Sequence, residues 1–328
     1  MTAGLSSRRA FAALVLGGIV TVSGVRTPPN GAAIAGTVQS PDAKELRLQL
    51  ISVGGIVYQL MGGGGSSLVL IREDNVVLID SKPHGWGTAV LEAVARLTDL
   101  PVTTVIHTDA HLDRVGGSLD IPTLIDIVAH ENAARLMKTM SEFSGAGTKA
   151  LPNKIVGKHL SLFEGRDRVD LYHFGRGHTD GDLVVVFPEH KIAYLGDLFP
   201  LKGVPSIDAA RGGSVLALAD TLGAIAREIK GVERVVAGRD LGPPAGKPRA
   251  SFGDLHSWSD FEEYAAFNRD LVAAARTAMS AGKTPEQALT GLALAAKYPG
   301  YDLQHARANV EILYRELTAQ RSGTAPAR

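Results

Sequence analysis

One segment, Thr104–Leu119, constrains the fold of this chain more than any other. Its sequence is Thr-Val-Ile-His-Thr-Asp-Ala-His-Leu-Asp-Arg-Val-Gly-Gly-Ser-Leu. The β-branched residues of Val102–Ile106 predict a buried strand that ends where this segment becomes polar. Four potential metal ligands then follow at alternate positions: His107, Asp109, His111 and Asp113. So many ligand-type side chains directly after a strand indicate a chelating loop rather than a solvated turn.

A second, glycine-rich segment carries a further histidine. Asp170–Phe174 predicts a strand, and the eight residues that follow, ending at Asp182, are Gly-Arg-Gly-His-Thr-Asp-Gly-Asp. The glycines let the backbone turn sharply enough to aim the His178 imidazole inward. Thr179 and Asp182 are expected to hold this loop in place.

The two segments resemble the His-x-His-x-Asp-(His/Arg) and Gly-x-Gly-His-Thr-x-Gly motifs of the metallo-β-lactamase superfamily. When the paired glycines are aligned, Asp109 takes the place of the first histidine. His111 and Asp113 match the second histidine and the aspartate, and Arg114 stands where many members have a further histidine. The resemblance covers about residues 47–245. It implies an α/β fold, the four-layer αββα metallo-β-lactamase sandwich, here with a C-terminal helical extension.

The resemblance also implies a ligand set. His178 occupies the third ligand position of the family. Asp197, after the predicted strand Ile192–Leu195, matches an aspartate that can bridge two metals. Where the family has Gly-His-Gly after its last strand, this chain has Arg239. Asp80, at the end of another predicted strand, is either a support beneath the metal site or an ordinary acidic turn residue.

The ligand types divide the expected site into two metal positions. At the first position, Asp109, His111 and His178 supply one carboxylate and two imidazoles. This set suits a catalytic zinc ion, which keeps one coordination position open for water. Two histidines and one carboxylate suit iron(II) equally well. We therefore expect one ion here, either zinc or iron.

The second position keeps Asp113 and Asp197, but Arg239 replaces its histidine. A guanidinium group cannot bind a cation because it has no free lone pair and stays protonated. It can donate charge-assisted hydrogen bonds to either carboxylate. We expect Arg239 to supply the positive charge that a second metal would otherwise bring.

The mechanism that follows is single-metal hydrolysis of an ester, an amide or lactam, or a related bond. A metal lowers the pKa of its bound water from ~15.7 toward ~7. Asp113 is expected to orient the water and act as general base, because no metal claims that carboxylate. Arg239 or Arg114, behind the metal, would help to stabilise the oxyanion. The substrate is a small molecule, and lactam, lactone, thioester and phosphoester all remain open.

Two other classes of function remain as alternatives. The altered positions Asp109 and Arg239 would fit a degenerate, non-catalytic binding protein with this fold. A carboxylate-rich site with one metal would also fit a redox or sulfur-handling relative. The metal content of the purified protein separates the three classes, because they predict zinc, no metal and iron respectively.

Three of the histidines outside these motifs have specific interpretations. His130, at the end of the apolar run Ile125–Ala129, is expected to be structural. His190 lies in a Pro-Glu-His turn and is expected to be solvated. His256, beside Trp258, could replace the lost histidine at the metal, although loop histidines usually face solvent.

The chain divides into four parts by composition: an export signal at residues 1–25, a flexible linker at 26–46, the metallo-β-lactamase-like domain at 47–245 and a helical extension at 246–328. Apolar stripes in the extension predict docking on the core, with a homodimer interface as the alternative. The N-terminal Arg8-Arg9 pair precedes an apolar run, Ala12–Val25. This pattern looks like a twin-arginine export signal. The run is shorter than the roughly 20 residues of a membrane span. We therefore expect a periplasmic or secreted protein with no stable membrane span after processing.

Composition narrows the classes of partner. The formal net charge is zero and aromatic residues make up 5% of the chain, so no feature indicates a nucleic-acid partner. The chain has no cysteine, which excludes a thiolate as nucleophile or metal ligand.

Overall fold

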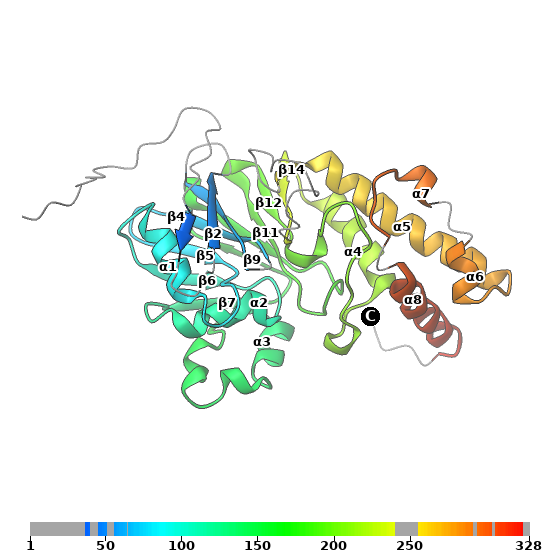
Figure 1. Cartoon of the computed structure of the whole chain (residues 1–328), viewed down its shortest axis with the longest axis horizontal. Helices are drawn as coiled ribbons and strands as arrows, with labels where there is room; N and C mark the ends of the chain where they lie inside the picture. The colour runs from blue at the N-terminus through cyan, green and yellow to red at the C-terminus, as the bar shows by residue number, and fades with distance from the viewer. Residues whose placement is uncertain are drawn as a thin grey trace, which may run out of the picture.

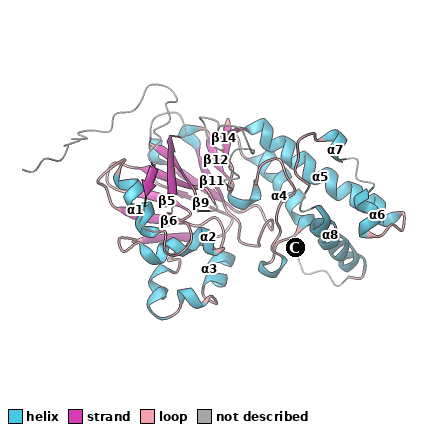
Figure 2. Ribbon diagram, viewed as in Figure 1, coloured by secondary structure: helices cyan, strands magenta, loops and turns pink. Residues whose placement is uncertain are grey.

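Two β-sheets packed between layers of helices make up the fold (Figures 1 and 2). This computed structural model describes residues 37–39, 45–50, 56–63, 65–239, 255–290, 294–303 and 306–323. The predicted export signal and the Pro-rich segment after Arg239 lie outside these residues.

The first sheet has eight strands whose spatial order follows the chain. Its neighbours are antiparallel from β1 to β5 and parallel from β5 to β8. The strands are Thr37–Gln39 (β1), Glu45–Leu50 (β2), Val57–Met61 (β3), Ser67–Ile71 (β4), Val76–Ile79 (β5), Val102–Ile106 (β6), Asp126–His130 (β7) and Lys154–Val156 (β8).

The second sheet has six strands in the order β14-β13-β12-β11-β10-β9. Only the β12–β13 pair is parallel. The strands are His159–Leu162 (β9), Val169–Tyr172 (β10), Val184–Phe187 (β11), Ile192–Tyr194 (β12), Arg234–Val236 (β13) and Leu255–Ser257 (β14). The strand predicted over Asp170–Phe174 corresponds to β10, and a 3₁₀ turn at Gly165–Asp167 joins it to β9.

Strand β5 shows why the central strands are apolar throughout. Val77 and Ile79 belong to the apolar cluster between the two sheets, which also contains Val185 of β11. Val76 and Leu78 belong to the cluster beneath the first layer of helices. Because both faces of this strand are covered, its sequence is a continuous apolar run rather than an alternating one.

The helices form the two outer layers. Helices α1 and α3 contribute to the apolar cluster on the outer face of the first sheet. Helices α4 and α5 pack on the second sheet, and α6 to α8 pack beside them at the other end of the molecule (Figure 1). The helices are Gly87–Ala95 (α1), Leu112–Val115 (α2), Glu131–Met137 (α3), Val215–Glu228 (α4), Trp258–Ser280 (α5), Pro285–Thr290 (α6), Leu294–Lys297 (α7) and Ala306–Arg321 (α8).

The C-terminal helices dock on the core, as their apolar stripes predict. Phe261, Tyr264 and Leu271 of α5 are buried in the same cluster as α4 and the outer face of the second sheet. Among the described helices, none combines the length and the apolar character needed to cross a membrane. The two sheets, the helices on their outer faces and the docked C-terminal helices together form the expected four-layer sandwich with a helical extension.

Candidate metal centre

Four loops meet at one edge of the sandwich. Strand β6 leads into the loop with Asp109 and His111, and the β10–β11 connection carries His178. Asp197 follows β12, and Arg239 follows the parallel strand β13. The carboxyl ends of parallel strands lie on one side of a sheet, so residues distant in sequence come together there.

The predicted first metal position is assembled in the structure. Asp109, His111 and His178 each offer a ligand atom, and these atoms all lie within 4.8 Å of one another. His111 Nδ1 lies 3.1 Å from Asp109 Oδ1 and 3.3 Å from His178 Nε2. Asp197 Oδ2 lies 3.4 Å from the same His178 nitrogen. Asp197 therefore borders the three-residue cluster, as a bridging aspartate would.

In both histidines of the cluster, the ring nitrogen that points away from the cluster centre (the outer nitrogen) forms a hydrogen bond with a protein oxygen. His178 Nδ1 lies 2.6 Å from the Ser206 carbonyl oxygen, and His111 Nε2 lies 3.0 Å from Asp208 Oδ2. When these outer nitrogens donate, His178 Nε2 and His111 Nδ1 keep their lone pairs for the centre of the cluster. Burial lowers the pKa of His111, but hydrogen bonds to Asp109 and Asp208 outweigh it and raise that pKa to about 9.

These residues fit a divalent cation. The second oxygen of Asp109, Oδ2, is buried without a hydrogen-bond partner among the residues that the structure describes. A buried carboxylate oxygen needs a partner, and a cation is the partner that this donor set would accept. Burial raises the pKa of Asp109, but the His111 hydrogen bond and the charge of His178 lower it below its ordinary value. Asp109 is thus held as the anion that a metal ligand must be.

Arg239 lies between the carboxylates of the second position. Its Nη1 lies 2.9 Å from Asp113 Oδ2, and its Nη2 lies 2.5 Å from Asp197 Oδ2. Burial disfavours its charge, but Asp197 and Asp113 more than compensate and raise its pKa. One guanidinium therefore contacts both of the aspartates that the sequence assigned to this position.

Arg114 lies beneath this pair and is fully buried. It donates to the carbonyl oxygens of Ser66 at 3.0 Å and Gly238 at 2.7 Å, and also to Asp197. This burial corrects the expectation that Arg114 helps to stabilise an oxyanion. It holds Asp197 in place from below, whereas the Arg239 side chain, 33% exposed, is the guanidinium that can reach a substrate.

Asp80 supports the ligand loop. Its buried carboxylate accepts from the Thr108 backbone N–H at 2.8 Å, from the Thr108 hydroxyl at 2.7 Å and from Tyr194 at 2.9 Å. Because Thr108 immediately precedes Asp109, these contacts fix the start of the loop. Of the two readings of Asp80 that the sequence left open, the structure favours the support.

The His178 loop is held as its sequence suggests. Thr179 donates to the Asp182 carboxylate through its backbone N–H, at 2.9 Å, and through its hydroxyl, at 2.6 Å. Burial raises the pKa of Asp182 to about 7. A Cβ at Gly177 would lie 2.2 Å from Cδ2 of Leu198 and 2.8 Å from Oδ2 of Asp182. A larger residue before the histidine would therefore displace side chains that pack against this loop.

The other histidines that the structure describes lie outside the cluster. His107 is buried with Nε2 3.1 Å from the Ser118 hydroxyl, and His130 stacks on His173 at 3.7 Å between ring centroids. The prediction that His190 is solvated is wrong. It is buried, with Nε2 2.9 Å from the Arg166 carbonyl oxygen, because its 3₁₀ turn packs on the turn after β9. His256 lies on β14, where its ring meets Phe199 edge-on, and it is not part of the metal cluster.

Sequence reasoning missed the two residues that hold the outer ring nitrogens, Ser206 and Asp208. Ser206 acts through its backbone carbonyl, which no side-chain pattern reveals. Asp208 begins the 3₁₀ helix Ala209–Arg211, so its sequence context indicates only a cap. The contact with His111 joins residues 97 positions apart and follows from tertiary structure alone.

Comparison with known proteins is consistent with this geometry. The sequence model of the metallo-beta-lactamase superfamily matches residues 60–273, about two thirds of the chain. This chain belongs to the metallo-beta-lactamase superfamily. The matched segment contains all the residues of the two metal positions.

Two curated members of the superfamily are similar over part of their length. A type 2 metallo-beta-lactamase from Bacillus sp. (strain 170) is 31% identical over 151 residues, 46% of this chain and 54% of that protein. Another from Bacillus cereus is 31% identical over 130 residues, 39% of this chain and 48% of that protein. The chain thus spans about half the length of the curated relatives it matches.

Solved structures share the superfamily fold. A metallo-beta-lactamase from Pontibacter korlensis matches with a TM-score of 0.52 and 17% identity, over 72% of this chain and 99% of that one. The sec-alkylsulfatase Pisa1 from Pseudomonas sp. matches with a TM-score of 0.66 and 14% identity, over 90% of this chain and 60% of that one. The residues before α5 make up less than 90% of this chain. The part that matches the sulfatase structure must therefore include some of the C-terminal helices.

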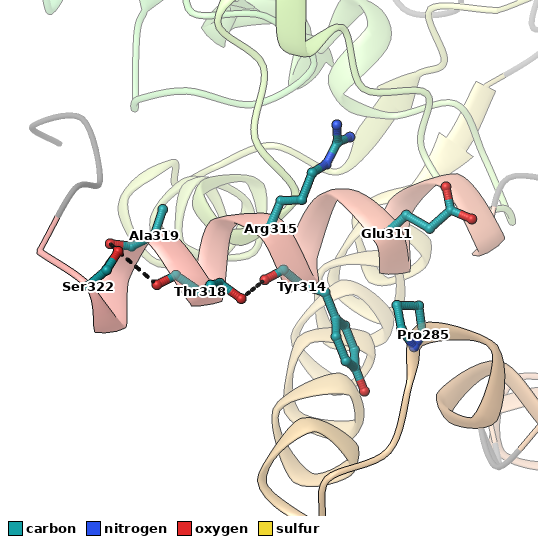
Figure 3. A pocket seen from close by; sticks show the side chains of 7 residues that line it. All are labelled: Pro285, Glu311, Tyr314, Arg315, Thr318, Ala319 and Ser322. Carbon is teal, nitrogen blue, oxygen red and sulfur yellow. Dashed lines mark hydrogen bonds between the residues drawn. The ribbon is translucent and has the colours of Figure 1, made fainter.

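A separate groove of about 640 Å³ lies on the C-terminal helices (Figure 3). It is lined by residues of α8, by Ser322 just after it and by Pro285 at the start of α6. None of these residues belongs to either metal position. The chemistry of this superfamily member is therefore to be sought at the sheet edge, not in this groove.

Proposed function

We propose that the chain is a metal-dependent hydrolase that uses one ion, held by Asp109, His111 and His178. The observation that carries this proposal is the convergence of one carboxylate and two imidazoles, with the outer nitrogen of each ring bonded to a protein oxygen. A zinc ion held by these residues would supply Lewis acidity and lower the pKa of water from ~15.7 toward ~7. Iron(II) remains the alternative ion.

The chain's own groups would handle the proton and the developing charge. Asp113, whose side chain is 25% exposed, orients a water molecule and accepts its proton. Arg239, paired with Asp113, lies where it can donate to an oxyanion that forms on the substrate. Arg114 and Asp80 hold the surrounding carboxylate and loop, so these groups need not reorganise during the reaction.

The number of ions follows from Arg239. Its two nitrogens contact Asp113 and Asp197, the carboxylates that a second ion would need. A second cation would have to displace the Arg239 guanidinium from both carboxylates. The cation and the guanidinium would then repel each other at short distance. We therefore propose a single resident ion.

The bond that is cleaved is an ester, an amide or lactam, or a related bond in a small molecule. The names of the relatives, lactamases and a sec-alkylsulfatase, add a lactam and a sulfate ester as the first substrates to test. The contact between Asp113 and Arg239 also favours a second candidate, a non-catalytic binding protein, because it engages the carboxylate that would have to orient the water.

The deciding experiment measures metal content and hydrolysis together. Purified protein is analysed for zinc and iron, stripped with a chelator and assayed before and after zinc is restored. The assay panel contains a chromogenic cephalosporin, an aryl ester and a secondary alkyl sulfate. We expect about one zinc per chain and turnover of at least one substrate that depends on zinc. A protein that holds no metal and turns over none of the panel supports the binding protein, and a protein that holds iron instead supports the redox relative.

We also propose that the protein is exported to the periplasm or secreted. The support is the Arg8-Arg9 pair followed by the short apolar run Ala12–Val25. Replacing both arginines with lysine should leave the protein in the cytoplasm, as measured by fractionation and immunoblotting. Unchanged export of the double variant contradicts the twin-arginine assignment.

A further inference from the structure

One loop contacts both histidines of the cluster from the outside. The segment 204–213 connects the region after β12 to helix α4. Its Ser206 carbonyl oxygen lies 2.6 Å from His178 Nδ1, and its Asp208 Oδ2 lies 3.0 Å from His111 Nε2. The two ligand rings come from different loops, so this segment, called the cradle loop below, links them.

Backbone hydrogen bonds attach the cradle loop to the His178 loop. Asp208 N–H donates to the His178 carbonyl oxygen at 2.9 Å, and Asp180 N–H donates to the Arg211 carbonyl oxygen at 3.0 Å. The two backbones approach so closely that a Cβ at Gly213 would lie 2.2 Å from the His178 oxygen. The cradle loop therefore cannot shift without moving His178.

The two oxygens of Asp208 have separate tasks. Oδ1 accepts from the backbone N–H groups of Ala210 at 3.0 Å and Arg211 at 3.1 Å, which caps the 3₁₀ turn. Oδ2 faces His111 Nε2 and accepts from Arg211 Nη1 at 2.6 Å. A cap requires only the first oxygen, so capping does not explain the position of the second. Arg211 keeps Oδ2 an acceptor, and His111 must then be the donor.

Helix α8 holds the other end of the cradle loop. Asn309, buried in α8, donates from Nδ2 to the Pro205 carbonyl oxygen at 2.8 Å. Val204 N–H donates to the Asp302 carbonyl oxygen at 3.0 Å. Pro205 directly precedes Ser206, so the C-terminal extension is one residue away from the group that orients His178.

We propose that Asp208 is a positioning residue of the metal site, which fixes His111 with Nδ1 toward the ion, and that α8 secures the cradle loop through Asn309. This inference rests on the proposed function, because it needs an ion at the cluster. It gives the C-terminal helices a task at the metal centre. Without the Asp208 acceptor, the ring proton of His111 is free to move to Nδ1, the nitrogen that must bind the ion.

Asp208→Asn separates the two tasks. Asparagine caps as well as aspartate, so its oxygen can replace Oδ1 in the turn. Its amide nitrogen then replaces Oδ2 and donates where an acceptor was needed, which favours the Nδ1–H form of His111. Asp208→Ser is the second variant: serine also caps but is too short to reach the imidazole. Asp180→Asn is the matched control, because it removes a nearby carboxylate that pairs with Arg135 and contacts neither ring.

The measurement uses the full-length chain, stripped of metal and titrated with zinc against a chromophoric chelator. Thermal melting of the stripped protein and the visible spectrum of the cobalt(II)-loaded protein are recorded in parallel. We expect Asp208→Asn and Asp208→Ser to weaken zinc binding about 10–100-fold, the usual cost of losing such a support. The cobalt spectrum should change, and the melting temperature should stay near that of wild type. Asp180→Asn should bind zinc normally. Asn309→Leu, which leaves the Pro205 oxygen without its donor, should weaken zinc binding several-fold.

Wild-type zinc affinity in both Asp208 variants overturns the proposal, and so does an equal loss in Asp180→Asn, which would indicate a general charge effect. If Asp208→Asn fails to fold, Asp208→Ser decides alone. Unchanged affinity in Asn309→Leu overturns the part assigned to α8. A wild-type chain that binds no zinc, cobalt or iron contradicts the proposed function as well, whereas wild-type zinc binding without any Asp208 effect contradicts this inference only.

Discussion

The two metal positions of this site contain similar groups, but those groups are arranged for opposite purposes: one set is free to bind a cation and the other is already paired with one. At the first position, Asp109 presents a buried oxygen that has no hydrogen-bond partner in the described part of the chain, and two imidazoles point their inner nitrogens at the same place. At the second position, the carboxylates of Asp113 and Asp197 are already engaged by Arg239. One position is built to receive a cation, and the other contains one.

The difference shows what a guanidinium can and cannot replace. Arg239 supplies the positive charge and directed hydrogen bonds that two adjacent carboxylates require. It offers no open coordination position and cannot acidify water, as a metal ion can. The chemistry is therefore expected at the first position, while the second keeps its carboxylates charged and ordered. Four experiments test this division, beginning with the one that has the largest expected effect.

The strongest test removes a ligand from each position in turn. His178→Ala should abolish retention of zinc and with it the zinc-dependent turnover, because a three-ligand site loses one imidazole. Asp113→Asn should retain zinc and lower turnover about 10²–10⁴-fold, the usual contribution of a general base. Elemental analysis and kinetics distinguish the two results, and His159→Ala, which changes a half-exposed histidine on β9, is the control. Loss of zinc in Asp113→Asn would mean that both positions hold the same ion.

A second test asks whether the second position can be changed so that it binds a metal ion. Arg239→His should raise the metal content from about one toward two zinc ions per chain, because an imidazole then joins Asp113 and Asp197 in place of a cation. Arg239→Gln is the control, since it removes the same charge without providing a good zinc ligand. Isothermal titration with zinc measures the stoichiometry. A second ion in both variants would show that charge removal alone admits it.

The pH dependence of stability tests the first position. The folded pKa of His111 is raised from 6.5 to about 9, so the proton stabilises the stripped protein fully below about pH 6.5. This contribution, on the order of 2 kcal/mol, is lost as the pH rises from 6.5 through 9. Zinc bound at the proposed site would occupy the nitrogen that carries this proton, so the loss should be absent from zinc-loaded protein. Urea unfolding at several pH values measures it, and the same slope in stripped His111→Ala would assign it to another group.

The smallest effect is expected from Arg239→Ala. Breaking a buried ion pair costs about 3–5 kcal/mol, but here Asp113 and Arg239 are partly exposed and Asp197 keeps Arg114. We expect the free energy of unfolding to fall by about 1–2 kcal/mol at neutral pH. The difference from wild type should shrink as the pH falls through the carboxylate range, since protonated carboxylates need no counter-charge. A pH-independent difference would indicate lost packing rather than lost charge.

Local pattern was enough to place most of the site. The predicted strand Val102–Ile106 coincides with β6, and the ligand loops begin where the sequence indicates. Glycines at positions where a side chain would come too close to a neighbour, such as Gly177, mark the His178 loop. The loop motifs and the family resemblance together named Asp109, His111, His178, Asp197 and Arg239, and the structure brings all five to one edge of the sandwich.

Other features depend on contacts between distant segments, which no local pattern contains. His190 was expected in solvent because its turn is polar, yet a second turn covers it. Arg114 was one of two arginines expected behind the metal to stabilise an oxyanion, yet it is fully buried among acceptors from three separate segments: Ser66, Asp197 and Gly238. Whether a polar side chain is exposed or enclosed depends on what packs over it, and this is decided only when the layers assemble.

The sequence by itself determined the family, the layered fold and the identity of the ligand-type residues, because strand periodicity, glycine positions and ligand spacing are local properties of the chain. Only the tertiary structure decided which nitrogen of each histidine faces the centre, that one arginine spans two aspartates, and that the C-terminal helix reaches the loop behind His178. These depend on hydrogen bonds between residues as many as 126 positions apart, whose geometry exists only after the two sheets have packed together.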